Sequence, residues 1–416
     1  MRAMDKERQV CAAFGDDWAS SENKAAVSGG RKRDLFAEQG HESRMRRGEG
    51  DCEFELRIPG LTDAERFLKA DPYSLAMAFV RGEFAVEGDL VAAVHFYRAR
   101  APRGFRRMAR TVFSLPSLFR LENWFQSRSR ATRNVRFHYD QPTHFYKQFL
   151  DSALVYSCAY FKPGAESLDD AQIAKMDHIC RKLRLSHGES FLDVGCGWGA
   201  LCRHAVEKYR AQSTGCTLSA EQYRYAQAMI QERSLHPRAS IKLLDYRDLE
   251  GPFDKIASVG MFEHVGTRRL DSYFRRLFEL LRKGGMLLNH GIIRPQTTRE
   301  GLEAAFLRNK VFPGSEIPRL PDAIRSAERA GFEVLDVENL RPHYALTCRA
   351  WVERLQTRAA ECLRSVDAAT YRTWLLALAA SAACFEDGSM NVNQILLYKP
   401  GEPAGRPLTR DYMYAK

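Results

Sequence analysis

The sequence predicts an α/β fold built on a doubly wound sheet, preceded by a smaller α+β module. Three observations support this fold class. From about residue 137, strand-like apolar runs alternate with helix-like amphipathic runs. A glycine-rich turn directly follows the first of these strands. The 416 residues, 45% of them apolar, suffice for one large domain and a smaller one. Alternating strands and helices are typical of a parallel sheet covered on both faces.

The predicted elements follow one another in a regular order. The expected strands are the apolar runs "SFLDVGC", "STGCTL", "ASIKLLD", "FDKIASVG", "MLLNHGI", "EVLDVENL" and "NQILLYKP". The expected helices are "LCRHAVEKYR", "SAEQYRYAQAMIQERS", "RRLDSYFRRLFELLRKGG" and "DAIRSAERAGF". Ser219 is the predicted N-cap of the second helix, with Gln222 at the capping-box position. Sheets of this kind bind ligands at the carboxyl ends of their strands.

The composition divides the chain into five parts. Residues 1–50 are polar and charged, and we expect them to be disordered. Residues 51–97 form a small α+β module, and residues 98–136 a basic and apolar connector. Residues 137–400 form the large α/β domain, and residues 401–416 a tail.

The connector carries most of the formal net charge of +11. Residues 98–136 hold eleven arginines against one acidic residue, Glu122, among many large apolar side chains. This mixture suits an anionic membrane surface, where arginines meet headgroups and aromatic rings enter the interface. Nucleic acid is the rival partner because its phosphates attract the same charges, and a solvated linker is the third interpretation. We favour the membrane surface.

Two further features bear on location. The chain has no run of about 18 apolar residues, and its first residues lack an apolar signal segment. Its ten cysteines show no framework spacing. We therefore expect a cytoplasmic protein with free thiols, associated with the inner face of the cell membrane only peripherally.

The glycine-rich turn runs from Asp193 to Gly199 and has the form D-x-G-x-G-x-G. Its glycines are spaced by two, so the dinucleotide pattern G-x-G-x-x-G fails. The pattern is instead typical of enzymes that bind S-adenosylmethionine, where the acid suits the cationic amino end of the ligand. A tight βα turn without function is the alternative.

Glu263 and His264 follow the fourth predicted strand, and His290 follows the fifth. An acid–histidine pair at a strand end could be a general base, a metal site or a hydrogen-bonded structural pair. The spacing of these residues matches no compact metal motif, so we expect no metal.

Several motifs in order resemble one family. They are "YSCAYF", "FLDVGCGWGALCRHAVE", "TLSAEQYRYAQ", "DYRDL", "FDKIASVGMFEHVG", "FPGSEIP" and "HYALTCRAW". Over residues 136–400 the chain resembles cyclopropane-fatty-acyl-phospholipid synthases, a group that includes mycolic acid cyclopropane synthases and related fatty acid C-methyltransferases. Residues 52–97 are similar, more weakly, to the lipid-binding module of bacterial members. The resemblance implies a Rossmann-like, S-adenosylmethionine-dependent methyltransferase domain, and family members are often homodimers.

The resemblance also implies two sets of site residues. Those expected to contact the methyl donor are Tyr156, Ser157, Phe191, Asp193, Gly195, Gly197, Trp198, Gly199, Thr217, Leu218, Gln222, Tyr246 and Arg247. Gln222 can serve both the donor and its helix cap. Those expected around a bound bicarbonate are Cys158, Glu263, His290, Ile292 and Tyr344, with Cys158 and Ile292 contributing mainly backbone.

The implied reaction transfers a methyl group from S-adenosylmethionine to the cis double bond of an unsaturated acyl chain of membrane phospholipid. Phe262, Tyr160 and Tyr344 are candidates to stabilise the resulting carbocation. Loss of a proton from the new methyl group to bicarbonate gives a cyclopropane fatty acid. If the carbocation instead loses a neighbouring proton or undergoes a hydride shift, the product is a methyl- or methylene-branched fatty acid, which is the first alternative.

Two functions of other classes are disfavoured by the sequence. A nucleic-acid methyltransferase is disfavoured because "MFEH" stands where such enzymes carry a proline- and aromatic-containing tetrapeptide, so we expect no nucleic-acid partner. A non-catalytic lipid-binding protein is disfavoured by the intact donor turn.

The chain departs from the family pattern near the acyl pocket. A cysteine common in the late helix is Ser381 here, while Cys384 adjoins Phe385. This departure leaves the product open. Residues 296–320 are expected to form a lid over the acyl pocket, with an ordinary insertion as the alternative.

Overall fold

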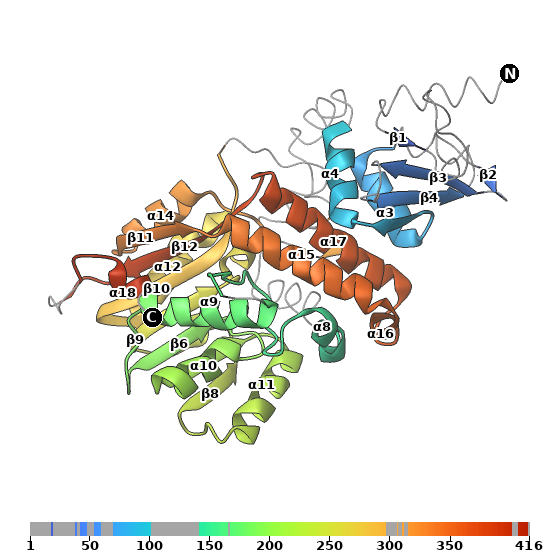
Figure 1. The fold of residues 1–416 in the computed structure, drawn as a ribbon. Coiled ribbons are helices and arrows are strands. Elements are labelled where there is room, and N and C mark those ends of the chain that lie inside the picture. The colour runs from blue at the N-terminus through green and yellow to red at the C-terminus, as the bar shows by residue number, and fades with distance from the viewer. Residues whose placement is uncertain are drawn as a thin grey trace. The chain divides into compact units, whose positions relative to one another are not determined.

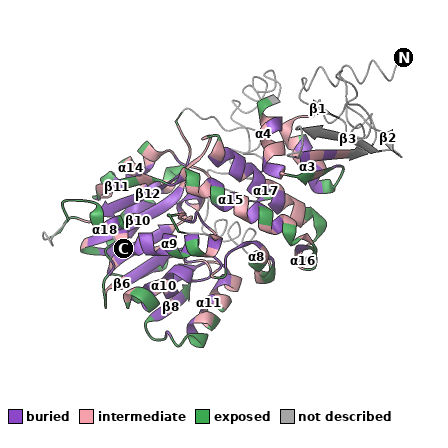
Figure 2. Cartoon of the chain, viewed as in Figure 1, coloured by how far each residue is buried: buried purple, intermediate pink, exposed green. Residues whose placement is uncertain are grey.

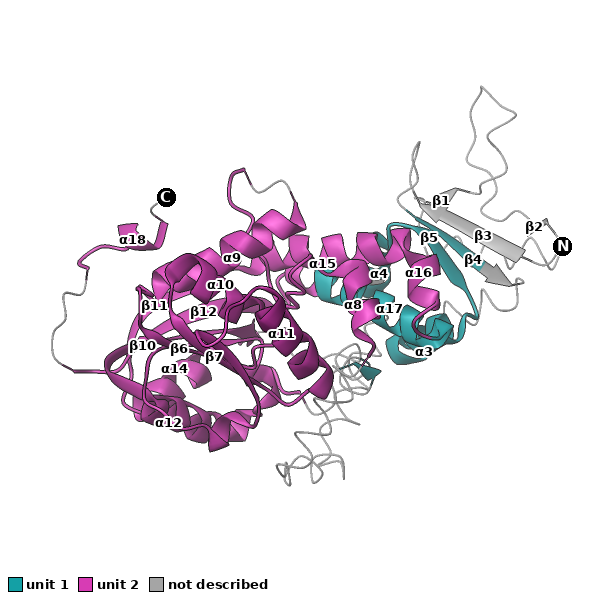
Figure 3. Ribbon diagram, turned by 90° about the horizontal axis from the view of Figure 1, so that it is seen from below, with its two compact units in different colours: residues 1–120, 300–311, 367–383 teal, residues 121–299, 312–366, 384–416 magenta. Residues whose placement is uncertain are grey.

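The computed structural model divides the chain into two compact units (Figure 3). Unit 1 comprises residues 1–120, 300–311 and 367–383, and unit 2 the remainder. The structure describes residues 18–19, 38–39, 42–47, 54–59, 70–100, 141–164, 167–296, 306, 310–311, 315–401 and 407–414.

Unit 2 is built on a seven-stranded sheet (Figure 1). Its strands are β6 (Ser190–Val194), β7 (Gln212–Thr217), β8 (Ala239–Leu243), β9 (Phe253–Val259), β10 (Leu281–Ile293), β11 (Glu333–Asn339) and β12 (Asn391–Tyr398). They lie in the order β11-β12-β10-β9-β6-β7-β8. Strands β10, β9, β6, β7 and β8 pair in parallel, while β12 is antiparallel to both neighbours. The sheet is thus mixed rather than parallel as predicted, because the direction of β12 cannot be read from an apolar run.

Helices cover both faces of this sheet, as the doubly wound prediction requires. The helices are α8 (Thr143–Phe149), α9 (Leu168–Lys182), α10 (Ala200–Tyr209), α11 (Ala220–Glu232), α12 (Leu270–Leu280), α14 (Leu320–Arg329), α15 (Arg341–Thr357), α16 (Ala359–Leu363) and α18 (Asp411–Tyr414). Phe191 and Met286 belong to the core with α9, α10 and α18, whereas Leu192 and Leu287 belong to the core with α12 and α14. Successive strand residues thus fill opposite cores. Figure 2 shows the buried strands between the helices.

Two local predictions need correction. The helix expected to continue to the glycines ends at Leu280, because Leu281 already pairs with Phe253 as the first residue of β10. Ser219 is the N-cap of α11, as predicted, and its hydroxyl accepts the Gln222 amide hydrogen. Thr217 lies between the two capping-box residues: the Ser219 amide hydrogen donates to Thr217 Oγ1 at 3.2 Å, and Gln222 Oε1 accepts the Thr217 hydroxyl at 2.7 Å.

Unit 1 contains a five-stranded sheet and several helical segments. Its strands are β1 (Trp18–Ala19), β2 (Glu38–Gln39), β3 (Glu42–Arg47), β4 (Phe54–Pro59) and β5 (Ala85–Gly88). Its helices are α3 (Pro72–Arg81), α4 (Leu90–Arg100) and most of α17 (Ala368–Glu386). Residues 1–50 were expected to be disordered; the strands β1, β2 and β3 are the parts of this range that the structure describes. Local polarity could not reveal their pairing, because β3 pairs with β4, a strand farther along the chain.

Unit 1 also encloses an apolar cavity of about 110 Å³. Its lining includes Phe54, Leu56, Phe79, Phe96, Leu376 and Ala380. Most of the predicted connector (98–136) and of the predicted lid (296–320) lies outside the residues that the structure describes. Within the described ranges, no helix combines the length and the apolarity that crossing a bilayer demands.

Candidate active site

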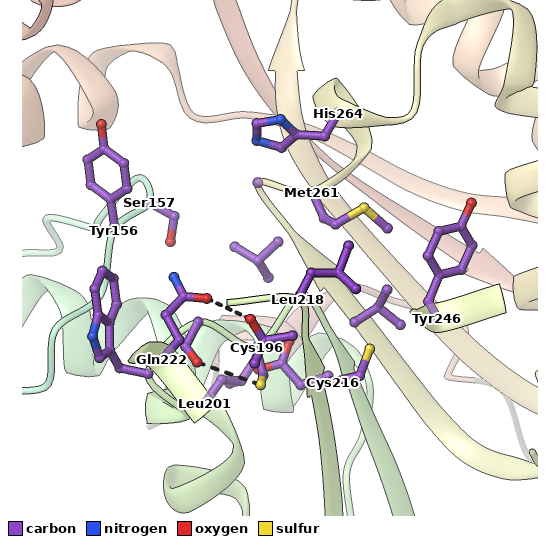
Figure 4. Close-up of a pocket in the computed structure, with 18 of the residues that line it drawn as sticks. Tyr156, Ser157, Cys196, Leu201, Cys216, Leu218, Gln222, Tyr246, Met261 and His264 are labelled. Atoms are coloured by element: carbon purple, nitrogen blue, oxygen red, sulfur yellow. Dashed lines mark hydrogen bonds between the residues drawn. The ribbon is translucent and has the colours of Figure 1, made fainter. Parts of the chain in front are cut away.

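A cavity of about 170 Å³ lies at the carboxyl ends of β6, β7, β8 and β9 (Figure 4). Its wall includes eleven of the thirteen residues expected to contact the methyl donor, namely Tyr156, Ser157, Asp193, Gly195, Gly197, Trp198, Thr217, Leu218, Gln222, Tyr246 and Arg247. The other two lie behind the wall: Phe191 is fully buried in the core, and Gly199 is the N-cap of α10. We call this cavity the donor pocket.

The glycine-rich turn needs glycine for two reasons. Gly195, Gly197 and Gly199 have φ values of +78°, +54° and +78°, a conformation that L-residues with a Cβ disfavour. A Cβ on Gly195 would lie 2.9 Å from Met261 Cγ, whereas one on Gly197 would meet no atom closer than 4.0 Å. Gly195 therefore packs against the opposite wall, while Gly197 leaves its backbone open to a ligand.

The third strand contributes a rigid polar corner to the pocket. Asp245, two residues after β8, caps the short helix Tyr246–Asp248. Its carboxylate accepts hydrogen bonds from Arg247 Nε at 2.8 Å and from Arg247 Nη2 at 2.5 Å. This bonding raises the pKa of Arg247 and fixes its guanidinium. Figure 4 shows Tyr246 across the pocket from Tyr156 and Ser157. Asp245 was not among the predicted residues, although its place after a strand end could have revealed it.

The structure separates the acid–histidine pair that the sequence presented. His264 lines the donor pocket with Met261, whereas Glu263 does not line it. Glu263 Oε1 accepts the Ile292 amide hydrogen at 2.6 Å, and burial raises the pKa of Glu263 to about 7. Glu263 Oε2 is buried without a hydrogen-bond partner among the described residues. His264 therefore belongs to the donor pocket, whereas Glu263 belongs to a separate group of residues beside β10.

His290 on β10 is buried and presents an unused donor. Its Nδ1 lies 3.2 Å from Gln394 Nε2; with the Gln394 amide in this orientation its nitrogen donates to Nδ1, which assigns the ring hydrogen to Nε2. Burial lowers the pKa of His290 to about 3, so the ring is neutral. Nε2 has no partner in the described part of the chain. Such an orphaned polar atom calls for an explanation.

Tyr344 lies within electrostatic range of both Cys158 and Glu263. Burial raises the pKa of Tyr344, and the nearby Cys348, Tyr156, Cys158 and Glu263 raise it further. The Tyr344 ring stacks on Phe385 with centroids 4.4 Å apart. Tyr344, which belongs to α15, is therefore within electrostatic range of residues from the loop before α9 and from the short helix Phe262–His264.

The Cys158 thiol is unsuited to nucleophilic attack. The side chain is fully buried and its Sγ donates to the Ala159 carbonyl oxygen at 3.2 Å. Burial raises the pKa of the thiol, which keeps it protonated, whereas a nucleophilic cysteine must form the thiolate.

Replacement of Cys158 by serine should therefore lower kcat by less than about tenfold, because the hydroxyl can donate to the same carbonyl. Steady-state kinetics of C158S measures this. A loss of about a thousandfold or more, with the circular dichroism spectrum unchanged, would instead indicate a covalent role.

A metal centre finds no support in the described ranges. No group of three or more histidine, cysteine, aspartate or glutamate residues there has the arrangement of a metal site. The metal interpretation of Glu263, His264 and His290 is thus without a ligand cluster in this part of the chain.

Comparison with known proteins gives the family. The sequence model described as mycolic acid cyclopropane synthetase matches residues 126–395, about two thirds of the chain. The chain belongs to this family. It is also 39% identical over 350 residues to a probable fatty acid methyltransferase of Pseudomonas putida, covering 82% of this chain and 86% of that protein.

Solved structures of the family agree with the fold. The cyclopropane synthase MmaA2 of Mycobacterium tuberculosis matches with a TM-score of 0.62 at 32% identity, covering 64% of this chain and 97% of that one. The mycolic acid cyclopropane synthase CmaA1, complexed with SAH and CTAB, matches with a TM-score of 0.62 at 34% identity and the same coverage. The family resemblance and the Rossmann-like fold are confirmed. The chain is an S-adenosylmethionine-dependent methyltransferase of the cyclopropane synthase family.

Proposed function

We propose that this enzyme transfers a methyl group from S-adenosylmethionine to the cis double bond of an unsaturated phospholipid acyl chain, and that bound bicarbonate removes a proton to give a cyclopropane fatty acid. One observation carries the bicarbonate part of this proposal. Glu263 Oε2 and His290 Nε2 are buried hydrogen-bonding atoms without a partner in the described chain, one an acceptor and the other a donor.

Bicarbonate has complementary groups for both atoms. Its hydroxyl can donate to Glu263, and its other oxygens can accept from His290 and from the Tyr344 hydroxyl. The Ile292 amide hydrogen already binds Glu263, so Ile292 would act by orienting that carboxylate. Bound there, bicarbonate would supply a weak base beside the reacting carbons.

The donor pocket fits S-adenosylmethionine, which supplies the electrophilic methyl group. Gly197 leaves space for close approach, and Asp193 offers a buried carboxylate. The chain's own contribution is to orient the donor and to exclude water from the reacting carbons. The ring of Tyr344 can stabilise positive charge on the acyl chain.

The phospholipid part of the proposal rests on sequence and composition. The arginine-rich residues 98–136 suit an anionic headgroup surface, which would hold the enzyme peripherally at the membrane. The apolar cavity of unit 1 offers a second surface suited to hydrocarbon.

The decisive experiment supplies vesicles of cis-monounsaturated phospholipid and methyl-labelled S-adenosylmethionine to the purified enzyme. Mass spectrometry of the extracted lipid should show acyl chains that gain one methylene and carry the label, and vesicles of saturated phospholipid should gain none. Label that appears only in small molecules or nucleic acid would refute the proposal.

A methyl- or methylene-branched product is the second candidate. The similarity to a probable fatty acid methyltransferase favours it, as does Ser381, which replaces a family cysteine. Ozonolysis of the extracted lipid before mass spectrometry separates the two isomers, because ozone cleaves the double bond that the branched product retains and the cyclopropane has no such bond.

A further inference from the structure

Lys175 of α9 is a buried cation on the wall of the donor pocket. Its side chain is 2% exposed, although a buried lysine normally lies against a compensating carboxylate. Nζ donates to Ser157 Oγ at 3.1 Å. An ammonium group has three donors, so this bond leaves most of its capacity unused.

The neighbouring carboxylates do not accept the remaining hydrogen bonds of the Lys175 ammonium group. Asp151 and Asp193 both influence the pKa of Lys175 electrostatically, yet neither approaches within 4.0 Å of Nζ among the described contacts. Asp151 is occupied by the amide hydrogens of Val155 at 2.7 Å and Ala153 at 3.0 Å. Asp193 accepts only a long bond from Cys202 Sγ at 3.8 Å. Lys175 and Asp193 therefore line the same pocket without pairing with each other. Burial raises the pKa of Asp193 to about 7, and a bound ammonium group would favour its charged form.

This arrangement matches the charges of an α-amino acid. The aminoacyl end of S-adenosylmethionine is a zwitterion that carries one carboxylate and one ammonium group. We propose that Lys175 binds the carboxylate of the methyl donor while Asp193 faces its ammonium group. The inference rests on the donor occupying this pocket, and it adds Lys175 to the binding residues that the family resemblance implied.

Physical considerations favour Lys175 over the other cations of the wall. Arg247 is already bonded to Asp245, and Arg269 is partly exposed to solvent. A charge pair gains more when it is shielded from water. Burial also lowers the pKa of Lys175 to about 8, and a bound carboxylate would restore the charged form.

Calorimetric titration with two ligands tests the proposal. One ligand is S-adenosylmethionine, and the other is its decarboxylated analogue, which lacks only the carboxylate. The wild-type enzyme should bind the complete donor about 10- to 100-fold more tightly. In Lys175→Met, the Kd for S-adenosylmethionine should rise about 10- to 100-fold, while the Kd for the analogue should change less than about threefold.

Lys182→Met is the matched control. Lys182 is a second fully buried lysine of α9, but it pairs with Asp336 at 3.2 Å and Glu338 at 2.6 Å and does not line the pocket. This variant should retain the wild-type preference between the two ligands. Arg269→Met should retain it as well.

Two results would overturn the assignment. Equal weakening of both ligands in Lys175→Met would show a merely structural lysine. Equal affinity of the wild-type enzyme for the two ligands would exclude any carboxylate contact, whether or not the variant folds. A wild-type enzyme that binds neither ligand would instead contradict the use of this donor.

Discussion

Replacing Glu263 by glutamine should lower kcat about 100- to 10,000-fold while leaving the Kd for S-adenosylmethionine within about threefold of the wild type. The glutamine oxygen can still accept the Ile292 amide hydrogen, so the short helix Phe262–His264 should keep its place. The unpartnered acceptor Oε2 becomes an amide donor, which cannot bind the hydroxyl of bicarbonate. Donor binding should persist because Glu263 does not line the donor pocket.

Turnover in carbonate-depleted buffer measures the role of the ion directly. Added bicarbonate should restore turnover of the wild-type enzyme and leave E263Q inactive. Full wild-type turnover in depleted buffer, or an E263Q enzyme with near wild-type kcat, would contradict the proposed ion site.

The same substitution should change how stability depends on pH. Burial raises the pKa of Glu263 from 4.5 to about 7, so its favourable, protonated form is fully present below pH 4.5. That contribution is lost as pH rises from about 4.5 to about 7, and amounts to roughly 3 kcal/mol. The free energy of unfolding of E263Q should not show this decrease between pH 4.5 and 7, because glutamine does not ionise. Denaturant unfolding at a series of pH values measures the difference between the two free energies of unfolding.

Glu338 is a suitable control because its pKa is shifted in the opposite direction from that of Glu263. The bonds from His178 and Lys182 lower its pKa to about 2, against the effect of burial. Its stabilising contribution is therefore present above about pH 4.5 and is lost as pH falls towards 2. The stability deficit of Glu338→Gln should shrink over that acidic interval. Parallel pH curves for E263Q and Glu338→Gln would contradict both assignments.

Much of the fold was predictable because its signals are local. Alternating apolar runs gave the strands of unit 2, and the positive φ of Gly195 and Gly197 follows from the glycine pattern itself. The direction of β12 was not predictable, because it depends on β10, a partner about 100 residues away in sequence.

The site residues also divide into those that local sequence predicts and those that it does not. Residues directly after strands, such as Thr217 and Tyr246, could be expected at the pocket because carboxyl ends of parallel strands meet at one edge. Lys175 gave no such signal, since a lysine in an amphipathic helix is normally solvated. The separation of Glu263 from His264 also depends on the three-dimensional course of the short helix that holds them.

Gly291 should be the glycine of the site least tolerant of a side chain. It lies between His290 and Ile292 on β10, and an added Cβ would stand 2.4 Å from Phe262 Cδ1 and 2.5 Å from Cε1. Phe262 is 1% exposed within the core, so its ring cannot move without disturbing its neighbours. Gly291→Ala should lower the free energy of unfolding by about 3 kcal/mol, which corresponds to about 5–10 °C in Tm.

Two further variants separate this clash from other effects of replacing glycine. Gly164 has φ +87°, and a Cβ added there would meet no atom within 4 Å, so Gly164→Ala should cost only about 1–2 kcal/mol of backbone strain. Phe262→Leu removes the ring that the alanine would meet, and the double variant should therefore be more stable than the sum of the two single changes predicts. Additive losses, or an unchanged Tm in Gly291→Ala, would contradict the clash. Because Phe262 precedes Glu263, relief of the clash should also restore part of the activity that Gly291→Ala loses.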